Sequence, residues 1–183
     1  MKKNDSSILF AAAAVSRETE NECVRIQDQM RRTIPGSYPD QRNFHVTFAY
    51  LGNVPNERCQ EAAAAAAAVP LHAGMLVFDH LENFAGGRGD TIVLASEPNE
   101  ALEEYRARLH AEFQARGFPP EASVFIPHVT LVRAKISHVD ISSLAVLKTC
   151  TQIDRVIVYR SFQMKGRRIY EPVICQGQEA ALQ

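Results

Sequence analysis

The chain has 183 residues, of which 46% are hydrophobic, so it can form one substantial domain or two small lobes. Its formal net charge of -1 argues against a protein that coats long nucleic acids, because such binding depends on many neutralised phosphates. A small anionic substrate, or one that is bound only at its end, is compatible with this charge.

The first segment combines a basic start with an apolar run. Lys2 and Lys3 precede the apolar residues 8–15, an order that also occurs in signal peptides, but the polar residues 4–7 separate the two features. We therefore expect residues 8–15 to form a strand. No stretch approaches the roughly 20 apolar residues that span a bilayer, so no membrane anchor is expected.

A helix is expected next, at about residues 17–33. Apolar residues recur there at helical spacing, namely Cys23, Ile26, Met30 and Ile34. The turn residues Pro35-Gly36 end it, and a strand that carries His45-Val46-Thr47 follows. Pro55 then opens a helix through the alanine run 62–68, and a strand is expected at 73–80.

The second half of the chain has the same order of elements. A strand is expected at 91–98 and a helix at about 98–116, with helically spaced apolar residues Leu102, Tyr105, Leu109 and Phe113. Turn residues around Gly117 precede a strand that carries His128-Val129-Thr130. Two last strands are expected at 152–161 and 168–175, joined by a basic turn at 163–167, whereas 136–148 gives no clear prediction.

The two His-Val-Thr tripeptides lie 83 residues apart, and this offset also superposes the strand and helix before each of them. A tripeptide alone recurs easily by chance, but chance does not explain the matched periodicity around it. We therefore predict one domain over residues 1–183 that is built of two pseudo-symmetric lobes. Their approximate bounds are 1–85 and 86–183, with strands exchanged between the lobes.

The cysteines favour a reduced protein. They are widely spaced and form no C-x-x-C pair, which excludes a zinc ribbon and a disulfide framework: Cys23, Cys59, Cys150 and Cys175. A cytoplasmic location fits this pattern best.

Each motif can supply acid-base chemistry. Alternate side chains of a strand share a face, so His45 lies beside Thr47, and His128 beside Thr130, with apolar residues on the opposite faces. Histidine, with an ordinary pKa of about 6.5, supplies a neutral base and a charged acid near neutrality. Threonine hydroxyls can bind the non-bridging oxygens of a phosphate, so two such pairs across a cleft suit phosphodiester cleavage without a metal.

The histidines have two other possible roles, as structural strand residues or as zinc ligands. A single His-x-Thr is more often a strand histidine bonded to a backbone carbonyl, but its duplication favours catalysis. A catalytic zinc normally takes three protein ligands at diagnostic spacing, which the remaining histidines do not show: His72, His80, His110 and His138. We therefore predict no metal site.

Residues 44–52 (FHVTFAYLG) and 127–133 (PHVTLVR) resemble the two signature motifs of the 2H phosphoesterase superfamily. The chain is most similar to its bacterial RNA 2',3'-cyclic phosphodiesterases, historically called 2'-5' RNA ligases, and the likeness covers nearly its whole length. The resemblance implies a bilobal α+β fold, in which two antiparallel sheets face a central cleft with helices outside. It also implies hydrolysis of RNA 2',3'-cyclic phosphate ends to 2'-phosphomonoesters without a cofactor.

By position, the resemblance makes His45 the acid that protonates the leaving 3' oxygen and His128 the base that activates water. Thr47 and Thr130 would hold phosphate oxygens. Arg133 matches a family arginine, but strict alternation places it on the face opposite His128, so a phosphate role needs a bulge or a strand end there.

Further candidates for substrate binding lie in turns. Phe84 can stack on a base, or equally anchor the loop in the core. Arg88 adds charge to the glycine loop 86–89, which can bind phosphate through its backbone N-H groups but is more often a plain hairpin connection. Lys165 and Arg167, with Arg168, form a basic cluster that suits an RNA backbone or simple solubility. Tyr170 follows that cluster near the end of the likeness.

Other functions remain open at this stage. The same chemistry can act on a cyclic-phosphate nucleotide or on a 2'-5'-linked oligonucleotide, and a protein that keeps the cleft without turnover would only bind RNA ends. Intact histidines and threonines in both motifs argue against the latter. RNA ligation would be the reverse of hydrolysis, because no nucleotidyl-lysine motif occurs. The expected partner is an RNA end or a small cyclic-phosphate nucleotide, bound by a monomer that needs no protein partner.

Overall fold

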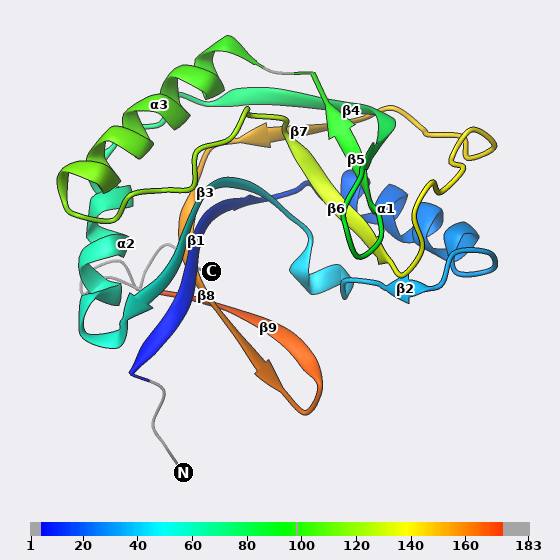
Figure 1. Cartoon of the computed structure of the whole chain (residues 1–183). Helices are drawn as coiled ribbons and strands as arrows, with labels where there is room; N and C mark the ends of the chain where they lie inside the picture. The colour runs from blue at the N-terminus through cyan, green and yellow to red at the C-terminus, as the bar shows by residue number, and fades with distance from the viewer. Residues whose placement is uncertain (1–4, 98, 174–183) are drawn as a thin grey trace.

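Two antiparallel sheets make up the body of the molecule (Figure 1). The structure is a computed structural model that describes residues 5–97 and 99–173. The first sheet has the order β3-β1-β8-β9, with bounds β1 Ser6–Ala14, β3 His45–Pro55, β8 Ile157–Met164 and β9 Arg167–Pro172. The second has the order β2-β6-β5-β4-β7, with bounds β2 Gly36–Ser37, β4 Gly74–Phe84, β5 Thr91–Ser96, β6 His128–Ala134 and β7 Thr149–Ile153.

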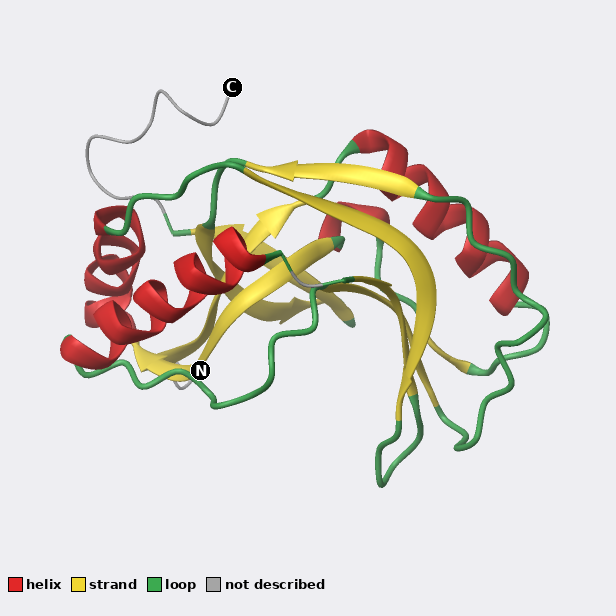
Figure 2. Ribbon diagram, turned by 90° about the horizontal axis from the view of Figure 1, so that it is seen from above, coloured by secondary structure: helices red, strands yellow, loops and turns green. Residues whose placement is uncertain are grey.

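The three α-helices of the described residues lie on the outer sides of these sheets (Figure 2). They are α1 (Arg17–Met30), α2 (Cys59–Ala68) and α3 (Glu100–Ala115), and short 3-10 turns occupy Gln41–Asn43 and Asn56–Arg58. Side-chain oxygens cap two of the helices: Ser16 accepts from the backbone N-H of Thr19, and Asn99 from that of Leu102. The arrangement of sheets and helices confirms the predicted α+β class.

Each long helix covers the sheet that its preceding strand does not belong to. Helix α1 follows β1 of the first sheet but packs on β6 and β7 of the second. Helix α3 follows β5 of the second sheet but packs on β3 of the first and on α2. A buried hydroxyl cluster fixes the α1 contact, because Thr19 Oγ1 lies 2.9 Å from Thr149 Oγ1 and 3.0 Å from Thr151 Oγ1.

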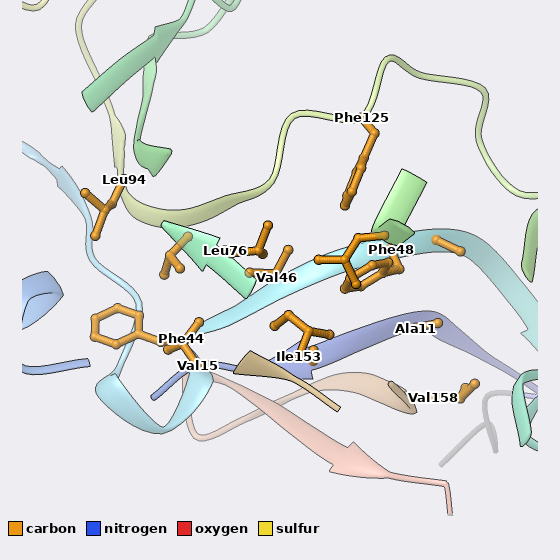
Figure 3. Close-up of a cluster of buried hydrophobic side chains, with 14 of the residues drawn as sticks. Ala11, Val15, Phe44, Val46, Phe48, Leu76, Leu94, Phe125, Ile153 and Val158 are labelled. Atoms are coloured by element: carbon orange, nitrogen blue, oxygen red, sulfur yellow. The ribbon is translucent and has the colours of Figure 1, made fainter. Parts of the chain in front are cut away.

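One apolar core joins the two sheets (Figure 3). The buried faces of the motif strands contribute Val46 and Phe48 to it, and Phe48 lies 5.2 Å from the ring of Phe125. Side chains of the second sheet, such as Leu76 and Leu94, lie in the same cluster. The histidine-bearing faces of the motif strands are therefore backed by a continuous apolar layer.

The structure corrects several predicted boundaries. The single strand expected at 152–161 is two strands, because Asp154 and Arg155 break the pattern and the chain crosses from β7 to β8 in the other sheet. The helix expected at 17–33 ends at Met30, whose carbonyl accepts from both Thr33 and Ile34. Strand β4 runs to residue 84, four residues beyond its predicted end, and the basic turn is only Lys165-Gly166.

Other predictions are refined or fall partly outside the structure. The helix expected from Pro55 begins as the turn at 56–58 and becomes α-helical at Cys59. The last strand ends at Pro172, and Cys175 lies outside the described residues. The cysteines of the described part, Cys23, Cys59 and Cys150, are free. No helix within residues 5–97 and 99–173 is long and apolar enough to cross a membrane.

Candidate active site

The two motif strands present matching faces. In β3, His45 and Thr47 are half-buried toward the open side, while Val46 is fully buried; in β6, His128 and Thr130 repeat this pattern. The alternation predicted from the sequence is therefore present in both strands.

A β-bulge follows each motif at the same place. Residue Phe48 has no partner on β1, since Ala11 pairs with Ala49 and Ala12 with Thr47. Residue Leu131 likewise has no partner on β5, since Ile92 pairs with Val132 and Val93 with Thr130. The extra residue inverts the alternation that follows, as bulges do.

The bulge in β6 turns Arg133 to the face of His128, where it lines a cavity with His45 and Thr47. This is the condition that a phosphate role for Arg133 needed. The bulge in β3 does the same for Tyr50, which lies 83 residues before Arg133 and lines the same cavity. Each motif thus places a third side chain on the cleft, a phenol in one strand and a guanidinium in the other.

Side chains of α1 and α3 donate hydrogen bonds to the backbone carbonyls of the two bulged residues. The Gln27 amide on α1 donates to the Leu131 carbonyl at 2.8 Å. On α3, His110 Nε2 donates to the Phe48 carbonyl at 2.9 Å, and Arg106 Nε donates to the same oxygen at 3.0 Å. No local motif of the sequence predicts that Gln27, Tyr50 and His110 lie at the site. The 83-residue offset, which maps Gln27 onto His110, is the signal that finds them.

The backbone fixes the orientation of both motif histidine rings. His45 Nδ1 lies 2.7 Å from the Asn43 carbonyl oxygen, and His128 Nδ1 lies 2.7 Å from that of Ile126. A carbonyl only accepts, so each Nδ1 carries a proton and each neutral ring keeps its Nε2 lone pair for chemistry.

Aromatic rings pack against both imidazoles. His45 lies 5.0 Å from Phe10 and 5.2 Å edge-on from Tyr170, and His128 lies 5.1 Å edge-on from Phe84, measured between ring centroids. The structure therefore brings Tyr170 and Phe84, both predicted from the sequence as substrate-binding, against the histidines. Their ring contacts also give them a role in packing.

Burial makes both histidines weak bases. It lowers the pKa of His45 to about 4, with further lowering by the charges of His128 and Arg133. The pKa of His128 is also lowered, chiefly by burial and also by Arg133, while the Glu82 carboxylate opposes the shift. The effect of the His128 charge on His45 shows that the two imidazoles share one electrostatic environment.

Two adjacent cavities lie along the motif strands. One, of about 420 Å³, is lined by His45, Tyr170 and Arg133, and the other, of about 120 Å³, by His128 and Phe125. Thr47 and Tyr50 line both, so they mark the place where the cavities meet.

Known proteins match this chain over most of its length. The sequence profile described as "2'-5' RNA ligase superfamily" matches residues 15–149, which include both motifs. This chain belongs to the 2'-5' RNA ligase superfamily. The family resemblance found in the sequence, to the 2H phosphoesterases, is thereby confirmed.

This chain is similar to the RNA 2',3'-cyclic phosphodiesterase of Geobacillus stearothermophilus. The two are 24% identical over 173 residues, which make up 90% of this chain and 55% of the relative. The chain therefore spans about half the length of the curated relative it matches.

Solved structures share the fold of this superfamily member. Escherichia coli LigT complexed with 3'-AMP matches with a TM-score of 0.79 at 21% identity, over 92% of this chain and 96% of LigT. A protein of Thermus thermophilus matches with a TM-score of 0.71 at 18% identity, over 91% and 95% of the two chains. These matches confirm the predicted fold of two antiparallel sheets.

The other residues that the sequence predicts to bind substrate fall into two groups, one beside the cleft and one away from it. Arg167 lines a third cavity beside the cleft, together with Arg168 and Tyr170. Lys165 sits at the tip of the β8–β9 hairpin and Arg88 at the tip of the β4–β5 hairpin, and both are exposed and outside the cavities described above.

The glycine loop has a structural explanation. A Cβ atom on Gly89, whose φ is +125°, would clash with the Ala134 carbonyl oxygen, and one on Gly86 would lie 2.6 Å from the Gly89 carbonyl oxygen. The glycines are therefore needed for close backbone approach in the hairpin. In the described part of the chain, no three side chains of His, Cys, Asp or Glu converge as a metal site would require.

Proposed function

We propose that this protein hydrolyses the 2',3'-cyclic phosphate at an RNA end to a 2'-phosphomonoester, without a metal. The observation that carries the proposal is the paired geometry: two imidazoles, one on each sheet, each with Nδ1 hydrogen-bonded to a carbonyl and Nε2 available for proton transfer. The similarity to the RNA 2',3'-cyclic phosphodiesterase of Geobacillus stearothermophilus supports the substrate class.

In this mechanism the phosphate lies between the two motif strands. Thr47 and Thr130 donate hydroxyl hydrogens to its non-bridging oxygens, and the Arg133 guanidinium neutralises the charge that grows on them. His128 Nε2 removes a proton from water as the water oxygen bonds to phosphorus. His45 Nε2 gives a proton to the 3' oxygen as the P–O3' bond breaks, which leaves a 3' hydroxyl and a 2'-phosphate.

The product and its independence of metal are tested together. A short RNA that ends in a 2',3'-cyclic phosphate is incubated with the protein, and the product is compared with 2'- and 3'-phosphate standards by chromatography. We expect the 2'-phosphate, at a rate that survives prolonged EDTA treatment and does not rise with zinc or magnesium. Loss of activity on chelation, with recovery on one added metal, would instead require a metal-bound nucleophile.

The lowered pKa values predict an acidic optimum for kcat/KM. A diester phosphate does not titrate in this range, so the profile reports the histidine pair of the free protein. The pKa of His45 is about 4 and that of His128 lies below 6.5, so the pair carries a single proton mainly at acidic pH. The reactive form, with His45 charged and His128 neutral, is one of the two singly protonated forms and rises and falls with their total.

We therefore expect a bell-shaped kcat/KM profile with its maximum between about pH 4 and 6.5, measured with controls for buffer identity. The bound phosphate anion stabilises an imidazolium, so the kcat profile is displaced to higher pH. A rate that rises steadily to pH 10 would mean that hydroxide attacks directly and that no protonated histidine takes part.

A further inference from the structure

The two ends of the cleft are related by the 83-residue repeat, but they differ in charge. Beyond His45 lies a cavity of about 440 Å³, which we call the arginine groove. It shares Arg133 and Tyr170 with the catalytic cavity, so the two are continuous. Its cationic lining residues are Arg31, Arg42, Arg133, Arg167 and Arg168.

The groove concentrates positive charge in a chain whose net charge is -1. Asp40 is the sole carboxylate among its lining residues, and it pairs with Arg42 at 3.0 Å. Within residues 5–97 and 99–173, none of the other arginines of the groove has an ion pair, so no carboxylate of the described chain competes with an anionic ligand for them.

Contacts within the protein fix the positions of the residues that line the groove. The Tyr38 hydroxyl donates to the Ile34 carbonyl at 2.7 Å, and the Arg31 guanidinium lies 4.2 Å from the centre of the Tyr38 ring. Across the groove, the Asn43 amide donates to the Arg168 carbonyl at 2.9 Å and joins the segment before β3 to the β8–β9 hairpin. The Arg31 guanidinium is positioned by this stacking, and the planar guanidinium of arginine is suited to bidentate phosphate contacts.

The opposite end, beyond His128, has the reverse character. Its cavity is lined by Tyr50, Phe125 and Glu121, and the Glu82 carboxylate acts on His128. The arginine among its lining residues, Arg106, is bonded to the carbonyls of Phe48 and Ser123. A second anionic group of the substrate is therefore favoured at the His45 end and disfavoured at the His128 end.

Building on the proposed function, we infer that the arginine groove binds a second phosphate of the substrate, on the His45 side of the cyclic phosphate. This phosphate is either the 5'-phosphate of the terminal nucleotide or the phosphodiester that links the preceding nucleotide. The groove thereby fixes the direction in which an RNA end enters the cleft and raises kcat/KM for substrates that carry a second phosphate.

The test compares three substrates that differ only in this group. They are a nucleoside 2',3'-cyclic phosphate, the same nucleotide with an added 5'-phosphate, and a dinucleotide that ends in the cyclic phosphate. We expect kcat/KM to rise about tenfold or more with the second phosphate. The logarithm of kcat/KM should also fall more steeply with the logarithm of salt concentration, by about 0.7 per added phosphate. Whether the gain comes with the 5'-phosphate or only with the dinucleotide identifies the source.

Substitutions in the groove give effects of opposite sign. The quantity compared is kcat/KM for a substrate with the second phosphate divided by kcat/KM for the substrate without it. Arg31→Ala should move this ratio toward unity. Asp40→Asn should raise it, because an asparagine still caps the turn at 41–43 while the opposing charge is lost. The exposed Arg108→Ala on α3 removes equal charge away from the groove and should leave the ratio unchanged.

Failure of this inference is distinct from failure of the proposed function. Equal kcat/KM for all three substrates, or a ratio that Arg31→Ala leaves unchanged, overturns the groove while hydrolysis itself stands. If no substrate is hydrolysed, calorimetric binding of the dinucleotide with a 2'-phosphate end reads the groove directly. Binding that is weakened by Arg31→Ala and strengthened by Asp40→Asn then supports it, and binding insensitive to both overturns it.

Discussion

Replacing His45 or His128 is expected to lower kcat/KM for an RNA 2',3'-cyclic phosphate by roughly 10² to 10⁴-fold, the range of one general acid or base. Asparagine is the informative replacement, because its amide can still donate to the carbonyl that each Nδ1 now contacts. It thus removes proton transfer while keeping the local hydrogen bond. Steady-state kinetics, with unfolding temperatures to confirm the fold, measure the effect.

A matched control and an altered substrate sharpen this experiment. His72→Asn changes an exposed histidine outside the cleft and should leave the rate unchanged. A substrate with sulfur in place of the 3' oxygen expels a thiolate that needs no proton, so it should restore His45→Asn but not His128→Asn. Restoration of the other variant would exchange the two roles, and near-normal turnover by either variant on the oxygen substrate would refute the paired mechanism.

Removing the charge of Arg133 is expected to have the next largest effect. Arg133→Gln should lower kcat/KM by about 10²-fold, as the loss of one preorganised contact to the transition-state oxyanion typically does. It should also move both limbs of the pH profile to higher pH, because the Arg133 charge lowers the pKa of His45 and of His128 in the intact protein. The kcat/KM profile over a range of about pH 3 to 9 would record both changes.

Arg133→Lys separates charge from shape. It keeps the positive charge, so the limbs should stay in place, but it loses the bidentate geometry and should retain only part of the rate. An Arg133→Gln variant with normal kcat/KM and unmoved limbs would show that the bulge in β6 has no bearing on catalysis.

The sequence predicts which faces of the two motif strands are buried, because that information is local and repeated. The alternation around His45 and His128 correctly gives the exposed and buried faces of both strands. The position of Arg133 is not predicted by strict alternation, since a bulge depends on the pairing of β6 with β5. The adjacent apolar residues Leu131-Val132, which repeat Phe48-Ala49, are the trace that this bulge leaves in the sequence.

Features that depend on contacts between residues far apart in the chain could not be predicted from the sequence. The arginine groove requires Arg31, at the end of α1, to meet Arg167 on β9, and no local pattern connects them. The crossing between β7 and β8 is hidden for the same reason, because alternating burial continues on both sides of it although the strands join different sheets. Pairing partners, and not propensities, decide such features.

The exchange of helices between the sheets has a consequence for how the molecule unfolds. A fragment that ended in the β4–β5 hairpin would keep α1 but lose β5, β6 and β7, most of the sheet that α1 covers. The complementary fragment would keep α3 without β1 and β3. Neither fragment closes a core of its own, so we expect the two sheets to melt as one cooperative unit. Heat therefore removes both halves of the histidine pair in a single transition, and no partly folded state retains one working half of the cleft.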